Sequence, residues 1–148
     1  MTTQENSTRY FDLHTRGIGY LNRARVVPVK RGQSFLAIDV AALHGAADDI
    51  QHTYFDCRVS VQEAQALVQA YLQEIRDGKA VLVAFNIGDI YPELFVYEKG
   101  PKQGQTGVSL KGRLLRLDWI KIDGAEVYRA PPKDAVLPEH APARRAAA

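Results

Sequence analysis

The stretch that decides the fold is residues 54–78, YFDCRVSVQEAQALVQAYLQEIRDG. At its beginning apolar and polar residues alternate, so that Phe55, Cys57 and Val59 face one side of a strand and the residues between them face the other. After Ser60 the apolar residues recur at three- and four-residue spacing, which is typical of an amphipathic helix. The stretch therefore predicts a strand that is followed directly by one helix.

The predicted helix has recognisable signals at both ends. Ser60 and Glu63 have the spacing of a capping box, in which the serine accepts from the backbone and the glutamate reaches back to it. Gly78 ends the apolar repeat as a C-cap. We expect one helix of about four to five turns. Its inner face carries the apolar residues Ala64, Leu67, Val68, Tyr71, Leu72 and Ile75.

Strands are predicted on both sides of this helix. Upstream, alternation and β-branched residues indicate strands over 18–29, 35–43 and 54–59, with a loop over 44–49. Downstream, strand signals cover residues 80–97 and 108–122, with a long flexible connection over 100–105. Asp123-Gly124 is typical of a type I′ turn, so residues 125–128 are expected to return as a hairpin.

This order of elements favours an OB fold, a five-stranded barrel with its helix between strands 3 and 4. Small SH3-like barrels usually lack that helix, and a ferredoxin-like fold would need a second one. We therefore expect residues 10–130 to form an all-β domain that contains one helix and ends in a C-terminal hairpin. Residues 1–9 are expected to form a flexible N-terminus, and residues 131–148 a disordered tail rich in Pro and Ala.

The composition is that of a soluble globular protein. The 148 residues are 46% hydrophobic and 24% charged, with a net charge of +2. Nucleic-acid binding would therefore need cations that are gathered on one face. Cys57 is the only cysteine, which excludes an internal disulfide and fits a reducing compartment. With no apolar signal at the start and no stretch near the ~18 apolar residues of a membrane span, we expect a cytoplasmic protein without a membrane contact.

Several stretches together carry a resemblance to a known family. They are YFDLHTRGIGYLNR (10–23), DVAALHG (39–45), YFDCRVS (54–60), GVSLKGRLL (107–115) and WIKIDG (119–124). Over roughly residues 10–130 the chain resembles a bacterial family carried on integrative and conjugative elements, whose members are described as element replication proteins. The resemblance implies an association with replication of mobile-element DNA, and it does not imply a mechanism.

A more distant similarity is to bacterial single-stranded DNA-binding proteins. It consists of a first strand with Gly and Leu, a small-residue second strand, an aromatic and basic third strand, and a short helix after it. This similarity implies an OB fold that binds single-stranded DNA. Those proteins end in an acidic tail with an aromatic tip that recruits partners, whereas this chain ends in Ala-Arg-Arg-Ala-Ala-Ala. We therefore do not expect partner recruitment through such a tip.

Binding a single strand needs aromatic faces for base stacking and cations for phosphates. OB barrels bind strands across their second and third strands, together with the loops that join strands 1–2 and 4–5. Aromatic and basic residues interleave at these places, and the expected nucleic-acid-binding residues are Tyr20, Arg23, Arg25, Tyr54, Arg58, Tyr91, Tyr97, Lys99, Lys102, Lys111, Arg113 and Trp119. The sequence does not decide whether Trp119 faces the core or the solvent. Its neighbours two residues away are the apolar Leu117 and the basic Lys121, so alternation indicates neither face. Other aromatic residues are expected in the core, namely Phe55, Phe85 and Tyr71.

The sequence offers little for catalysis. The four histidines, His14, His44, His52 and His140, have no mutual metal spacing. Asp48 and Asp49 lie between two of them, and this segment reads better as a polar loop than as a metal site. Cys57 lies on an inward strand face and is expected to be a buried thiol. Residues 100–107 are glycine-rich but lack the Gly-Lys-Ser/Thr ending of a phosphate loop. We expect no enzymatic activity, no metal and no cofactor.

Two functions stay open at this point. The first is largely sequence-independent binding of single-stranded DNA in replication or transfer of a mobile genetic element. The second is a protein–protein adaptor that uses an OB scaffold within a replication or conjugation complex. The first needs a basic groove, and the second needs an apolar surface patch. Exposed barrel edges and the hairpin over 121–128 favour a homo-oligomer, either a dimer or a tetramer, with element-encoded replication proteins as further partners.

Overall fold

The computed structural model of the chain describes residues 11–131. Its elements in chain order are β1 (His14–Val27), β2 (Phe35–Ala46), β3 (Asp49–Val59), α2 (Gln62–Ala70), α3 (Leu72–Arg76), β4 (Val81–Val96), β5 (Thr106–Ile122) and β6 (Ala125–Arg129). The expected N-terminal lead-in and the expected C-terminal tail lie outside the described residues, apart from Pro131. Within residues 11–131, no helix is both long enough and apolar enough to cross a membrane.

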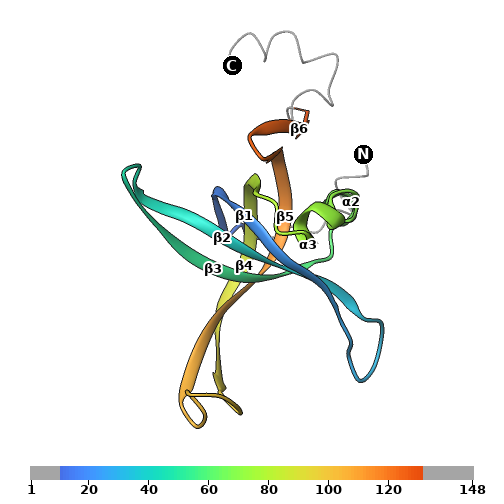
Figure 1. Cartoon of the computed structure of the whole chain (residues 1–148). Coiled ribbons are helices and arrows are strands. Elements are labelled where there is room, and N and C mark those ends of the chain that lie inside the picture. Colours follow the sequence, from blue (N-terminus) through green and yellow to red (C-terminus); the bar gives the residue numbers. More distant parts are fainter. Residues whose placement is uncertain (1–10, 132–148) are drawn as a thin grey trace.

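The strands β1–β5 close into a ring. The sheet order is β3-β2-β1-β4-β5-β6, and an additional pairing between β3 and β5 joins the two sides. This closing pair is parallel and runs from Phe55↔Leu110 to Arg58↔Arg113. β6 pairs only with β5 and lies outside the ring. A five-stranded barrel with helix between β3 and β4 is an OB fold, so the predicted fold class is confirmed (Figure 1).

The barrel interior is formed by alternate residues of each strand. In β3, Phe55, Cys57 and Val59 are buried as predicted. The buried apolar residues of the other strands and of the helices complete one continuous core, which includes Leu36, Ile38, Val40, Val83, Phe85, Ile87, Leu114 and Ile120. Burial raises the pKa of the Cys57 thiol to about 12. The thiol is therefore protonated at neutral pH and belongs to the core.

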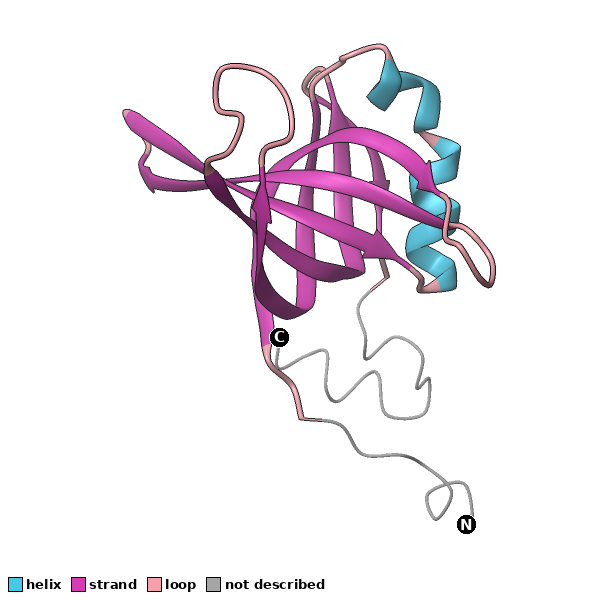
Figure 2. Cartoon of the chain, turned by 90° about the horizontal axis from the view of Figure 1, so that it is seen from below, coloured by secondary structure: helices cyan, strands magenta, loops and turns pink. Residues whose placement is uncertain are grey.

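The helical segment is interrupted, whereas the sequence pattern predicts one continuous helix. It is divided into α2 and α3 at Tyr71, whose backbone leaves helical geometry at φ −112° and ψ 21°. The Tyr71 hydroxyl donates to the carbonyl oxygen of Val127 in β6 at 3.2 Å, a long-range contact at the point of the break. Figure 2 shows the two segments lying together along one side of the barrel.

The predicted capping box at the start of the helix is wrong. The N-cap is Val61, without a side-chain hydrogen bond, because the helix begins one residue later than the pattern indicates. Gln65 Nε2 donates instead to the carbonyl oxygen of Val59, the last residue of β3, at 3.0 Å. The predicted C-cap is correct: Gly78 has φ +78°, and the next amide bonds back to Glu74 at 3.1 Å.

The hairpins show one further difference from the prediction and two agreements with it. The expected loop over 44–49 is wrong, because β2 and β3 continue to pair as far as Ala46↔Asp49 and leave only a tight turn. The connection between β4 and β5 lies where it was predicted, at the end of a long hairpin that extends beyond the barrel (Figure 1). Asp123 and Gly124 have φ of 50° and 89°, which fits the predicted type I′ turn into β6.

Candidate nucleic-acid interface

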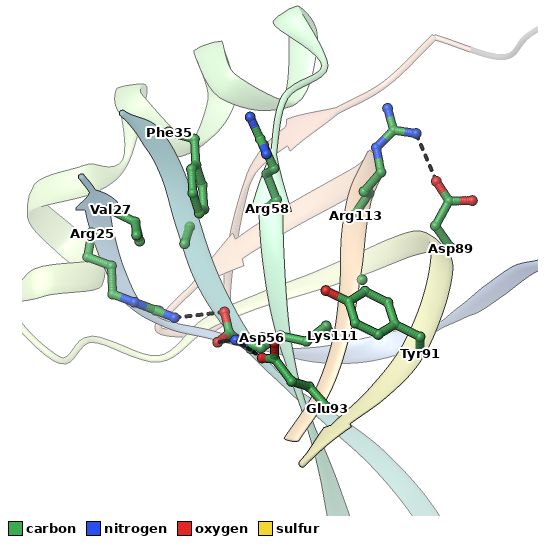
Figure 3. A pocket seen from close by; sticks show the side chains of 12 residues that line it. Arg25, Val27, Phe35, Asp56, Arg58, Asp89, Tyr91, Glu93, Lys111 and Arg113 are labelled. Atoms are coloured by element: carbon green, nitrogen blue, oxygen red, sulfur yellow. Dashed lines mark hydrogen bonds and ion pairs between the residues drawn. The ribbon is translucent and has the colours of Figure 1, made fainter. Parts of the chain in front are cut away.

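A cavity of about 360 Å³ opens on the outside of the barrel, and all five barrel strands contribute to it. We call it the outer-face cavity; it is lined by Arg25, Val27, Phe35, Ala37, Asp56, Arg58, Asp89, Tyr91, Glu93, Lys111, Gly112 and Arg113. Figure 3 shows these side chains on either side of the β3–β5 seam, with Asp56, Lys111 and Glu93 close together. Five of the twelve predicted binding residues are among them, so β3 and β5 bring together residues that are far apart in the sequence.

Strand alternation and register explain this convergence. Asp56 and Arg58 point outward because their neighbours in β3 are buried in the core. Across the parallel seam, Asp56 pairs with Lys111 and Arg58 pairs with Arg113. On the other side of Arg58 the neighbouring strand presents Ala37, whose small side chain is only 2% exposed. Ala37 therefore forms a low floor between long charged side chains.

A chain of ion pairs crosses the middle of the cavity. The Asp56 carboxylate accepts from Arg25 Nη2 and from Lys111 Nζ, each at 2.7 Å. Arg25 Nη1 also donates to Asp39 at 3.0 Å, and Lys111 Nζ lies 3.4 Å from Glu93. These contacts fix two of the predicted phosphate-binding cations in place, and they also occupy them with carboxylates.

The titration of these groups follows from the same contacts. Burial alone would raise the pKa of Asp56, but the Lys111 hydrogen bond and the Arg25 charge together hold that pKa below its usual value of 3.8. The hydrogen bond to Asp56 correspondingly raises the pKa of Lys111 above 10.5, against the opposing effect of burial. At neutral pH the pair is therefore fully charged.

A second ion pair lies at the base of the β4–β5 hairpin. Arg113 Nη1 donates to Asp89 Oδ2 at 2.9 Å. Asp89 has φ of 57°, in the left-handed region, within the stretch between Gly88 and Tyr91 where the β4–β5 register shifts. Aspartate tolerates this conformation better than most side chains. The bulge therefore places a carboxylate beside Arg113 and Tyr91 at the cavity rim.

Arg58 differs from the other cations of the cavity. Its guanidinium carbon lies 4.4 Å from the ring centroid of Phe35, and it makes no ion pair with any residue from 11 to 131. Figure 3 shows it pointing away from the carboxylates. The lining holds four Arg or Lys side chains and three carboxylates. The cavity is therefore close to charge balance rather than strongly basic.

A row of aromatic residues lies beside this cavity. Tyr20 of β1 and Tyr54 of β3 both pair with Ala41 of β2, so that they flank one small residue on the outer face. Tyr54 is 63% exposed and stacks on His52, with ring centroids 6.2 Å apart and planes at 24°. Arg23 is held by Asp39 at 2.9 Å. A neighbouring hollow contains Arg23 and Tyr54 and shares Asp56 with the outer-face cavity.

The remaining predicted residues lie elsewhere. Tyr97 packs edge-on against Phe95, with centroids 5.0 Å apart, and Lys102 Nζ lies 5.5 Å from the Tyr97 centroid. Together with Lys99 these residues lie at the far end of the β4–β5 hairpin, roughly 20 Å along the strand from Tyr91. Trp119 lies where β5 pairs with β4 and β6, under Lys121 Nζ at 5.0 Å, and it does not line the outer-face cavity.

The residues that the sequence reasoning missed are mainly carboxylates. Asp56, Asp89 and Glu93 line the cavity and pair with its cations. Strand alternation already places Asp56 and Phe35 on outward faces, so both could have been found from the sequence. The pairing of Asp56 with Lys111 could not, because it depends on the register between strands that are 55 residues apart.

Other features that the sequence singled out have ordinary structural partners. His44 Nε2 lies 3.0 Å from the Thr53 hydroxyl across the β2–β3 hairpin. In the part of the chain that the structure describes, no three His, Cys, Asp or Glu side chains are grouped as they would be around a metal ion. The glycine-rich segment 100–105 is the turn between β4 and β5.

Comparison with known proteins gives one finding. A family model described as "Protein of unknown function (DUF3577)" matches residues 3–136. No curated protein and no solved structure matches the chain.

Proposed function

The chain belongs to the DUF3577 family, whose function is unknown, and we propose that it binds single-stranded DNA, largely independently of sequence, across the outer-face cavity. The observation that carries this proposal is the convergence of Arg25, Arg58, Tyr91, Lys111 and Arg113 in one cavity of an OB barrel. OB barrels bind single strands on this part of their surface, between the second and third strands and the hairpin of strands 4 and 5.

The chemistry of the surface supports a backbone-and-stacking mode of binding. Tyr54 and Tyr91 are 63% and 53% exposed, although large aromatic residues are usually buried in a small barrel. Stacking on such rings contributes about 1–3 kcal/mol per base and tolerates any base. Arg58 lies four residues from Tyr54 on the same face of β3 and lines one cavity with Tyr91. It makes no ion pair with any residue that the structure describes, so it can contact a phosphate. The DNA strand would then run from Tyr54 on β3 towards the base of the β4–β5 hairpin.

The carboxylates limit the affinity. Phosphates must compete with Asp56 for Arg25 and Lys111, and with Asp89 for Arg113. Each phosphate contact that forms releases counterions, so binding weakens as salt is raised. We therefore propose modest affinity at physiological salt and a shallow salt dependence, in keeping with the net charge of +2.

The biological setting of the proposal comes from the sequence resemblance. It is replication or transfer of a mobile genetic element in the bacterial cytoplasm. The exposed barrel edges and the hairpin over 121–128 favour a dimer or tetramer of this chain as the binding unit. The aromatic and basic residues at the end of the β4–β5 hairpin, including Tyr97, Lys99 and Lys102, would extend the path of the strand beyond one barrel.

The test is a titration of fluorescein-labelled oligo-dT with the full chain, read by fluorescence anisotropy at low and rising salt. We expect saturable binding that weakens with salt, similar affinity for mixed-sequence oligonucleotides, and weaker binding of a duplex of equal length. Absence of binding at low salt would contradict the proposal. A strong preference for duplex would contradict it equally.

A second candidate function, that of a protein–protein adaptor, is favoured by one observation. Leu94 and Val108 pair across the β4–β5 hairpin and are 72% and 60% exposed, and Val96 continues the same face. Alternation places this apolar strip on the opposite face of the hairpin from Tyr91 and Glu93. Exposed apolar patches often mark contacts between proteins.

The two candidates can be separated with one double variant. Leu94→Ser with Val108→Ser should abolish capture of the element's own helicase or relaxase if the adaptor proposal is right, and leave oligo-dT affinity unchanged. If the variant binds both partners as the unaltered chain does, the strip is not a binding surface.

A further inference from the structure

A second cavity, of about 320 Å³, lies where β1, β4, β5 and β6 meet, and it shares no lining residue with the outer-face cavity. We call it the arginine cavity; it is lined by Arg16, Asn86, Arg116, Asp118, Arg129, Ala130 and Pro131. Arg16 pairs with Asn86 across β1 and β4, and Asn86 pairs with Arg116 across β4 and β5. One cross-strand row therefore reads Arg–Asn–Arg.

Asn86 is the most informative residue of this row. It is 6% exposed and is the only buried polar residue from 11 to 131, and its Oδ1 has no hydrogen-bond partner there. Its neighbours Phe85 and Ile87 occupy the core, so the Asn86 side chain points to the outside of the barrel, beneath the flanking arginines. A buried polar atom without a partner is unusual in a folded protein, so the position of Asn86 needs an explanation.

The charges around Asn86 favour an anion. Three guanidinium groups and one carboxylate line the cavity. Arg116 Nε donates to Asp118 at 2.6 Å, and its Nη2 donates to the Pro131 carbonyl at 3.1 Å. Arg129 is held by two hydrogen bonds to Glu126, at 2.6 and 3.0 Å. Arg16 makes no ion pair with any residue that the structure describes, so its charge is available to a ligand.

We propose that the arginine cavity is a binding site for a phosphate group, held by Arg16 and Arg116 with the Asn86 amide at its base. Guanidinium groups present planar, paired donors that match phosphate oxygens. Donors from β1, β4 and β5 converge, which suits the three terminal oxygens of a phosphate better than the two oxygens of a carboxylate. The Asn86 amide nitrogen is a hydrogen-bond donor, so it can donate to a phosphate oxygen at the base of the cavity.

The phosphate could be a free ion or the terminal phosphate of a nucleic-acid strand, and the chemistry of the site is the same for both. The proposal does not rest on the function proposed above, because inorganic phosphate alone suffices to test it. Its failure and the failure of DNA binding are therefore distinguishable.

The experiment follows the Asn86 side-chain amide and the Arg16 and Arg116 Nε signals by ¹⁵N NMR of the full chain. Sodium phosphate is added up to millimolar concentrations, with sodium chloride of equal ionic strength as the reference. We expect saturable shifts of these signals with phosphate and none with chloride. Absence of a saturable shift overturns the proposal.

Two variants and a control complete the design. Arg16→Gln should weaken phosphate binding about tenfold or more, since it removes a charge-assisted hydrogen bond. Asn86→Asp should abolish binding, because a carboxylate between the arginines repels phosphate. Arg76→Gln, on the exposed last turn of α3, removes an equal charge away from the cavity and should leave binding unchanged. Equal weakening by Arg76→Gln and Arg16→Gln would overturn the proposal, and Arg16 is exposed enough that its variant should fold.

The two sources of phosphate are distinguished with 5′-phosphorylated and 5′-hydroxyl oligo-dT. Tighter binding of the phosphorylated strand, lost in Arg16→Gln, assigns the site to a strand end. Equal binding of both strands, with retained shifts for inorganic phosphate, assigns it to the free ion.

Discussion

Arg58 lies over the ring of Phe35, with its guanidinium carbon 4.4 Å from the ring centroid. A flat ring beneath a guanidinium group stabilises the cation without neutralising it, unlike a carboxylate. The neighbouring cations Arg25, Lys111 and Arg113 each have a carboxylate partner. With respect to partners among residues 11–131, Arg58 is therefore the cation of the outer-face cavity that can meet a phosphate without first leaving one.

Replacement of Arg58 with Gln should weaken oligo-dT binding about three- to tenfold at low salt. It should also make the dependence of log affinity on log salt shallower by about 0.7, as expected for the loss of one phosphate contact on a single strand. Anisotropy titrations at several KCl concentrations measure both quantities. Arg76→Gln is the matched control, and an equal effect of the two variants would show that only net charge matters.

Replacement of Asp56 with Asn should tighten oligo-dT binding. The change removes the carboxylate that holds Arg25 and Lys111 at 2.7 Å, so both cations become available to phosphates. We expect about three- to tenfold higher affinity at low salt and a steeper salt dependence. The same titrations test it, with Glu63→Gln on the exposed surface of α2 as a control of equal charge change. Weaker binding by Asp56→Asn would mean that the ion-pair chain orders the site for DNA instead of competing with it.

The same substitution should change how stability depends on pH. The pKa of Asp56 is lowered in the folded protein, so its stabilising contribution is present above the unfolded-state pKa and is lost as pH falls through the folded-state pKa. At neutral pH, Asp56→Asn should lower the free energy of unfolding by about 1–3 kcal/mol. Between roughly pH 5 and pH 2 the difference from the unaltered chain should shrink. Urea unfolding of both proteins at a series of pH values measures this difference in the free energy of unfolding. A difference that stays constant with pH would contradict the lowered pKa of Asp56.

Replacement of Tyr54 with Ala should remove one stacking platform. The expected loss is about 1–3 kcal/mol of binding free energy, or roughly five- to 150-fold in affinity. Tyr54→Phe keeps the aromatic face and should bind within about twofold of the unaltered chain. If the two variants lose affinity equally, the Tyr54 hydroxyl, and not the ring, makes the contact.

Replacement of Gly19 with Ala should destabilise the barrel. A Cβ at this position would lie 2.5 Å from the Ala41 carbonyl oxygen and 2.9 Å from the Ala42 Cα, both backbone atoms of β2. Overpacking of this kind costs about 1–3 kcal/mol. Gly17→Ala, whose Cβ would meet only the Phe85 ring at 3.0 Å, should cost less because a side chain can shift. Thermal unfolding of the two variants gives the comparison.

Local patterns predicted most of the fold. Alternation placed Phe55, Cys57 and Val59 inside the barrel, and Gly78 and the Asp123–Gly124 turn were identified from residue type alone. The errors arose where tertiary contacts decide the outcome. Ser60 has the right spacing for a cap, yet the side-chain hydrogen bond at this junction is donated by Gln65 to the carbonyl oxygen of Val59 at the end of β3. The strands of the β2–β3 hairpin pair further than polar residues such as Asp49 indicate.

The candidate site was less predictable than the fold, and for a different reason. Residue type and alternation identify cations and aromatic residues on outward faces, but they do not show which carboxylates lie beside them. Asp56 meets Lys111 only through the register of β3 against β5, and Asp89 reaches Arg113 only through a bulge. The near balance of charge in the cavity follows from these pairings and could not be derived from the order of residues.

The parallel pairing of β3 with β5 has a consequence for the kinetics of folding. Asp56 and Lys111 are 55 residues apart in the chain, so this seam closes a long loop, and we expect it to form late in folding. An open sheet of the same strands would lack the outer-face cavity altogether. A ligand that contacts both strands therefore binds only the closed ring and shifts the opening equilibrium towards it by mass action. Amide hydrogen exchange along the β3–β5 pairing should therefore slow when the site is occupied.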